Sequence, residues 1–158
     1  MKKFFKIIVA MLIVLIPSAL FAADLDIICN ENAKPTIIRN TNPLFNITNF
    51  SPGDGETKSI SIVNLDPSNP CIIDLQGRGS SNILTDKINV LLDNQYISTL
   101  TDFIKGSRIN LGTIQSNTNT TNQLTLYLDQ NIGNTYSQNT ANFDILINSQ
   151  FTIISYNV

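Results

Sequence analysis

Leu124-Thr125-Leu126-Tyr127-Leu128 is the stretch that decides the fold class. Its three leucines alternate with Thr125 and Tyr127. Because successive side chains of a strand point to opposite faces of a sheet, this pattern predicts a half-buried β-strand. Similar alternation predicts strands at residues 25–29, 45–49, 57–65, 71–76, 96–100, 109–113 and 143–147, with residues 151–154 continuing or pairing with the last of these.

Polar turns separate the predicted strands. Ser51–Gly55 and Asp66–Pro70 carry the Pro, Gly, Asp and Asn residues typical of turns, and residues 115–122 contain no apolar side chain, which predicts a loop. Residues 83–93 fit either a helix or a strand, but the hairpin signal Asp93-Asn94 favours a strand.

One helical turn is predicted at residues 101–105, capped by Thr101 or Asp102 and ended by Gly106. Eight or nine strands without a long helix predict an all-β protein, an antiparallel β-sandwich.

The composition excludes several classes of chemistry. The 158 residues contain no His, so the chain has no Ser-His-Asp triad, no Cys-His pair and no His-based zinc site. The formal net charge of −2 shows no basic excess, and we therefore expect no nucleic-acid partner. Charged residues make up only 14%, so neutral amides and hydroxyls carry most of the polarity, as suits a β-rich protein outside the cell.

The first 22 residues have the layout of a secretory signal peptide. Three lysines precede the apolar run 7–16, Pro17 and Ser18 interrupt it, and Ala22 offers a small residue for cleavage. Cleavage after Ala22 is preferred to cleavage after Ala23, because it keeps Phe21 out of the third position before the cut. The alternative is a membrane anchor, although the apolar run falls short of the about 20 residues that span a bilayer.

Cleavage leaves seven Lys and Arg against twelve Asp and Glu, a net charge of −5. We expect a secreted protein, extracellular or at the cell surface, which meets the membrane only through its signal peptide during export. Cys29 and Cys71 remain after cleavage, and an even pair in a secreted chain predicts a disulfide. Two buried free thiols and an intermolecular bridge are the alternatives.

Three motifs follow one another at a characteristic spacing. The first runs from Leu44 through Pro52-Gly53-Asp54 to a strand that ends at Asn64. The second joins residues 109–114 across a polar loop to residues 124–128. The third is the loop 133–138, which leads into residues 141–147. In order and spacing these motifs resemble the TasA/camelysin family of secreted, fibre-forming bacterial proteins. The best-known members lack cysteines, and their signal peptides end in a Gly-rich, aromatic stretch that is missing here.

The resemblance implies a jelly-roll sandwich over residues 44–158 and assembly into biofilm-matrix fibres. It also implies that residues 23–43 act as a donor strand, which fills a groove of the next subunit with Leu25, Ile27, Ile37 and Ile38 as anchors. The alternative for residues 24–29 is the first strand of the chain's own sandwich.

Enzymatic function is considered because camelysin has been classed as a metalloprotease. Asp54 and Glu56 could offer oxygens to Ca²⁺, but two carboxylates fall short of the usual six to eight ligands. No pair of carboxylates suggests a general acid and base. We therefore expect no enzyme, no catalytic residues, no metal and no cofactor. The hypotheses are, in order, a fibre subunit, a monomeric surface-binding module for polysaccharide or protein, and a metal-dependent peptidase.

Overall fold

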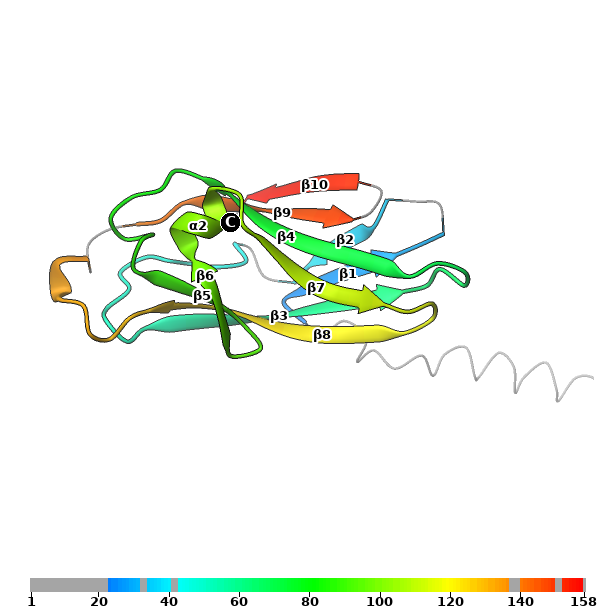
Figure 1. Ribbon diagram of the computed structural model, residues 1–158, viewed down its shortest axis with the longest axis horizontal. Helices are drawn as coiled ribbons and strands as arrows, with labels where there is room; N and C mark the ends of the chain where they lie inside the picture. Colours follow the sequence, from blue (N-terminus) through cyan, green and yellow to red (C-terminus); the bar gives the residue numbers. More distant parts are fainter. Residues whose placement is uncertain (1–22, 32–33, 41–42, 137–139, 150–151, 158) are drawn as a thin grey trace, which may run out of the picture.

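Two β-sheets pack face to face in the computed structural model (Figure 1). It describes residues 23–31, 34–40, 43–136, 140–149 and 152–157, and the predicted signal peptide lies outside these residues. The six-stranded sheet has the order β2-β1-β3-β8-β5-β6, and the four-stranded sheet the order β10-β9-β4-β7. The predicted all-β sandwich is confirmed.

The six-stranded sheet consists of β2 (Thr36–Arg39), β1 (Leu25–Cys29), β3 (Gly55–Asn64), β8 (Asn119–Leu128), β5 (Ile88–Leu92) and β6 (Gln95–Thr99). The four-stranded sheet consists of β10 (Thr152–Asn157), β9 (Phe143–Ser149), β4 (Cys71–Gly79) and β7 (Arg108–Ile114). The short helix α2 (Leu100–Ile104) follows β6, and a 3₁₀ turn, η2 (Asn134–Tyr136), precedes β9.

Strand β1 is the exception to the antiparallel pattern. It pairs in parallel with β3, with Leu25 opposite Ile60 and Ile27 opposite Ile62. The other pairings recorded for the described strands are antiparallel. The antiparallel prediction is therefore wrong for this one pair. Parallel strands need a long connection, which residues 30–54 provide here.

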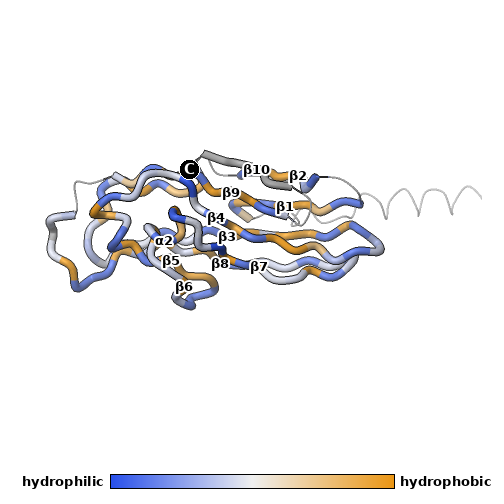
Figure 2. Tube along the Cα trace, turned by 45° about the horizontal axis from the view of Figure 1, so that its top comes forward, coloured by the Kyte–Doolittle hydropathy of each residue, from blue (hydrophilic) through white to orange (hydrophobic). Residues whose placement is uncertain are grey.

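The core lies between the two sheets and is built by the alternation that the sequence predicts. Leu124, Leu126 and Leu128 are at most 1% exposed, while the intervening Thr125 and Tyr127 are half-buried. Figure 2 shows the same alternation of hydropathy along the strands. Side chains of both sheets close this core, including Ile60, Ile62, Ile73, Leu75, Ile145 and Ile147.

The apolar stretch at residues 44–50 does not form the predicted strand. It has no regular structure, yet Leu44, Phe45, Ile47 and Phe50 are all buried in the core. Asn49 takes a left-handed φ of 59°, which breaks an extended strand but suits Asn better than most residues. The predicted inward side chains Phe45 and Ile47 are therefore confirmed as buried, whereas Asn49 is exposed and the predicted strand is wrong.

Two local predictions also change, and a third is confirmed. Strand β8 begins at Asn119, opposite Val63, so the predicted loop 115–122 shortens to residues 115–118. Helix α2 is capped by Thr99, whose side chain accepts the Asp102 amide hydrogen, instead of by Thr101 or Asp102. The Asp93-Asn94 hairpin is confirmed, with φ angles of 51° and 66° that suit a type I′ turn.

Candidate assembly site

The N-terminal hairpin β1–β2 is the part of the structure on which the donor-strand hypothesis bears. Strand β1 lies between β2 and β3, and Leu25 and Ile27 enter the core at 2% and 0% exposure. Ile37 packs against that core opposite Ile27, whereas Ile38 is half-buried opposite Asp26. In a single chain, all four proposed anchors therefore sit in the chain's own six-stranded sheet.

Polar contacts hold the beginning of β1 against β3. The Asp24 carboxylate accepts hydrogen bonds from the backbone N–H and the hydroxyl of Ser59, at 2.9 and 3.0 Å, and lies 3.7 Å from Lys58 Nζ. Burial raises the pKa of Asp24, but these hydrogen bonds and the Lys58 charge outweigh it, so the pKa lies below its ordinary value. The strand is thus fixed by specific contacts as well as by apolar burial.

A buried carboxylate, that of Asp26, lies two residues after Asp24, within β1. Asp26 is 1% exposed, and its Oδ2 accepts a 2.9 Å hydrogen bond from Asn40 Nδ2, which also donates to the Ala23 carbonyl. Among the described residues, no hydrogen-bond donor reaches Asp26 Oδ1. Asn40 thereby connects the end of β2 to the beginning of β1.

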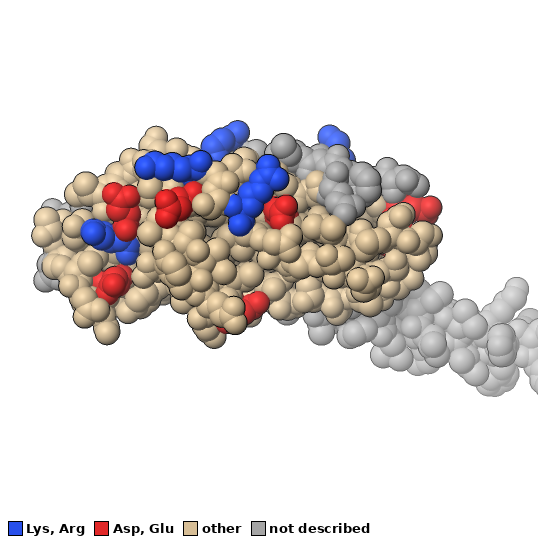
Figure 3. Space-filling model, in the orientation of Figure 1, with Lys and Arg blue, Asp and Glu red and all other residues tan. Residues whose placement is uncertain are grey.

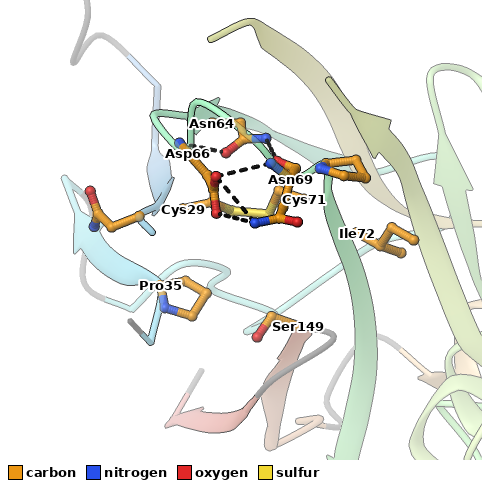
Figure 4. A pocket seen from close by; sticks show the side chains of 10 residues that line it. Cys29, Pro35, Asn64, Asp66, Asn69, Cys71, Ile72 and Ser149 are labelled. Atoms are coloured by element: carbon orange, nitrogen blue, oxygen red, sulfur yellow. Dashed lines mark hydrogen bonds between the residues drawn. A yellow bond between two sulfur atoms is a disulfide. The ribbon is translucent and has the colours of Figure 1, made fainter. Parts of the chain in front are cut away.

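The Cys29–Cys71 disulfide is present and closes the other end of β1. It connects the last residue of β1 to the first residue of β4, with the two Cα atoms 6.3 Å apart, and so joins the two sheets. Both cysteines are buried, at 6% and 8% exposure. Figure 4 shows the bond beside a small cavity of about 20 Å³, enough for roughly one water molecule.

A cluster of polar side chains, Asn64, Asp66 and Asn69, lies beside this disulfide (Figure 4), with the first two buried and Asn69 exposed. Asn64 is 0% exposed, and its Nδ2 donates to the carbonyls of Asn69 and Ile114, at 2.9 and 3.0 Å. Its Oδ1 accepts the Asp66 amide hydrogen at 3.0 Å. The sequence predicts only the turn at residues 66–70. It does not predict this cluster, because hydrogen bonds to distant carbonyls leave no local sequence pattern.

Asp66 organises the turn that carries Cys71 into β4. Backbone N–H groups of Ser68 and Asn69 donate to its Oδ1 at 2.8 and 2.9 Å. The Ser68 hydrogen bond is the main reason why the pKa of Asp66 lies below its ordinary value. An ionised Asp66 therefore stabilises the loop next to the disulfide.

The Pro52-Gly53-Asp54 motif has a clear structural role. Gly53 has a φ of 94°, which only Gly adopts readily, so Pro52 and Gly53 form the centre of a tight turn. The Gly53 amide donates to the Leu128 carbonyl at 2.9 Å, and the Leu128 amide donates to the Asp54 carbonyl at 2.8 Å. The motif fastens the beginning of β3 to the end of β8.

The carboxylates considered for calcium are bound to neighbouring groups of the chain. Asp54 Oδ2 accepts the Ser51 amide hydrogen at 2.7 Å, and Glu56 Oε2 accepts that of Asn46 at 2.7 Å. Glu56 Oε1 also lies 2.9 Å from Lys58 Nζ. Within the described residues, no group of three or more acidic or Cys side chains is placed to hold a metal ion.

The sheet edges and the charges define the remaining surface. Strands β2 and β6 end the larger sheet, and β7 and β10 end the smaller one. On β6, Tyr96 and Ile97 are 60% and 40% exposed. Figure 3 shows acidic and basic side chains interspersed over one largely uncharged face. No helix in the described part of the chain is long and apolar enough to cross a membrane.

Comparison with known proteins does not identify a relative of this chain. No protein-family model, curated protein or solved structure matches this chain. The resemblance to the TasA/camelysin family therefore depends on the motifs quoted from the sequence.

Proposed function

We propose that this chain is a secreted structural subunit of extracellular or cell-surface fibres, and that it assembles by exchanging its N-terminal strand between copies. One observation carries the proposal. Strand β1 supplies buried side chains to the core, yet the long connection 30–54 separates it along the chain from β3, its parallel partner in the sheet. A neighbouring copy can supply such a strand with the same contacts.

One-way donation of β1 would also give the polymer its direction. If β1 of one copy adds to β3 of the next, the donor and the acceptor surfaces of a subunit are different. Such a head-to-tail contact continues as an open filament unless two copies exchange their strands reciprocally or the rotation closes a larger ring. Alternate side chains of the strand, Leu25 and Ile27, would fill the neighbour's core and specify the register.

Secretion and a relation to the TasA/camelysin family, with its jelly-roll topology, belong to the same proposal. They are supported by the signal-peptide layout of residues 1–22, by the motif order and by a disulfide that suits an oxidising compartment. In this proposal the protein is not an enzyme, and its function is mechanical.

Electron microscopy and size-exclusion chromatography of residues 23–158 test the proposal. We expect filaments, and we expect deletion of residues 23–43 to abolish them, because the deletion removes the donor strand. Circular dichroism of the deletion variant would check that a β-sandwich remains. A chain that stays monomeric at every concentration and pH, whether reduced or oxidised, would contradict the fibre function, and filaments formed without residues 23–43 would contradict the donor strand.

The second candidate is a monomeric surface-binding module. It is favoured by the exposed Tyr96 and Ile97 on the edge strand β6, since apolar side chains on a sheet edge are suited to contact with another molecule. This function predicts a stable monomer that binds a polysaccharide or protein, with weaker binding after Tyr96→Ala. A metal-dependent peptidase is the least favoured, and chelator-sensitive peptide hydrolysis would support it.

A further inference from the structure

We propose that in the assembled fibre the Cys29–Cys71 disulfide connects neighbouring subunits, so that the polymer is covalently linked from end to end. The inference rests on the proposed function and adds a chemical bond to it. Strand exchange preserves native contacts but makes them between chains. Because Cys29 belongs to the strand and Cys71 to the body that receives it, the exchanged disulfide must be intermolecular.

The contacts around Cys29 fix where an incoming strand places its thiol. Cys29 lies opposite Asn64 on β3, and its carbonyl accepts the Leu65 amide hydrogen at 2.9 Å. At the other end of the strand, Asp24 is held by Ser59, which also belongs to β3. A donated β1 that made these contacts would bring its Cys29 to the acceptor's Cys71, as in the single chain.

The surroundings of the bond indicate when it must form. Both cysteines are at most 8% exposed, and the cluster of Asn64, Asp66 and Asn69 lies beside them. A monomer that has already formed its own disulfide keeps β1 in its own six-stranded sheet, because the bond ties the strand to β4. Strand exchange therefore precedes oxidation, and oxidation then makes the exchange permanent.

The reaction needs an oxidant, and a small-molecule disulfide is sufficient. The donor's Cys29 thiolate attacks that disulfide, forms a mixed disulfide and releases one small thiol. The acceptor's Cys71 thiolate then attacks Cys29 Sγ and releases the second small thiol. Two protein thiols thus lose two protons and two electrons, and the small disulfide gains them. Each internal subunit ends with one bond through its Cys29 and another through its Cys71.

Isotope mixing provides the decisive experiment. Reduced chains of residues 23–158, half of them labelled with ¹⁵N, assemble together and are then oxidised with glutathione disulfide, alkylated and digested with trypsin. Mass spectrometry compares the disulfide-linked peptides that contain Cys29 and Cys71. If the bond is intermolecular, about half of the pairs combine a heavy with a light peptide. Non-reducing electrophoresis should also show a ladder that reductant collapses to the monomer.

Two single variants give a matched control. A Cys71→Ser subunit can donate only Cys29, and a Cys29→Ser subunit can offer only Cys71, so their mixture should yield a linked dimer and no ladder. Fibres whose peptide pairs are entirely heavy–heavy or light–light would overturn the inference and leave the proposed function standing. Failure of the wild-type chain to form fibres, whether reduced or oxidised, would contradict the proposed function and this inference with it.

Discussion

At the scale of single residues, Asn64 is the side chain on which the region around the disulfide most depends. Its amide makes three hydrogen bonds, with Asn69, Ile114 and Asp66, at a position that is 0% exposed. We expect Asn64→Ala to lower the free energy of unfolding by about 3 kcal/mol, because it leaves buried backbone groups without partners. Denaturant unfolding measures the loss. The exposed Asn119 supplies the control, and equal effects of Asn64→Ala and Asn119→Ala would contradict this role.

Acid should weaken the fold through another residue of this region, Asp66. Its carboxyl binds a proton less readily in the folded chain than at its ordinary pKa of 3.8. The unfolded chain therefore takes up more protons as the pH falls, so the stabilisation present above that value is lost below it. We expect the wild type to lose more stability than Asp66→Asn between about pH 5 and pH 3. Equal losses in denaturant titrations would show that the Asp66 charge has no such effect.

At the scale of elements, helix α2 packs closely on β4 at Gly77. A Cβ atom there would lie 2.8 Å from Phe103 Cδ1, closer than real Cβ contacts, and 3.1 Å from the Ile104 backbone, tighter than most of them. We expect Gly77→Ala to cost about 1–3 kcal/mol by forcing α2 away from the sheet. Gly133→Ala is the matched control, because the nearest atom there is 3.9 Å away. Similar thermal unfolding of both variants would rule out the close packing.

The elements also show what the sequence can and cannot predict. Strands such as β8 were predictable because alternation, burial and pairing agree there. Residues 44–50 were not, because burial alone does not distinguish a strand from an irregular segment that a left-handed Asn49 interrupts. The parallel pairing of β1 with β3 is likewise invisible to a local pattern, since period-two alternation is the same for both strand directions.

At the scale of the whole molecule, the disulfide pairing was predictable because the chain has only two cysteines. The site around it was not, because the parallel pairing of β1 with β3 places Asn64 beside the end of β1, and the packing of the two sheets adds Cys71 and Ile114. The same arrangement links stability to assembly, since the residues that fix β1 in one chain are those that would fix it in a neighbour.

The last prediction concerns what the bond contributes to a single subunit. Cys29 and Cys71 are separated by 42 positions, and a loop of this length predicts about 4 kcal/mol of stabilisation by restricting the unfolded chain. We expect the double variant Cys29→Ser/Cys71→Ser, studied as a monomer, to lose about that much in denaturant unfolding. The loss should be greatest locally in β1 and β2, because only the bond ties the end of β1 to the other sheet covalently. In the double variant, amide hydrogen exchange should become faster in β1 and β2 than in β4 and β9. Equal changes of the exchange rate in all four strands would contradict the idea that the bond holds the N-terminal hairpin in place.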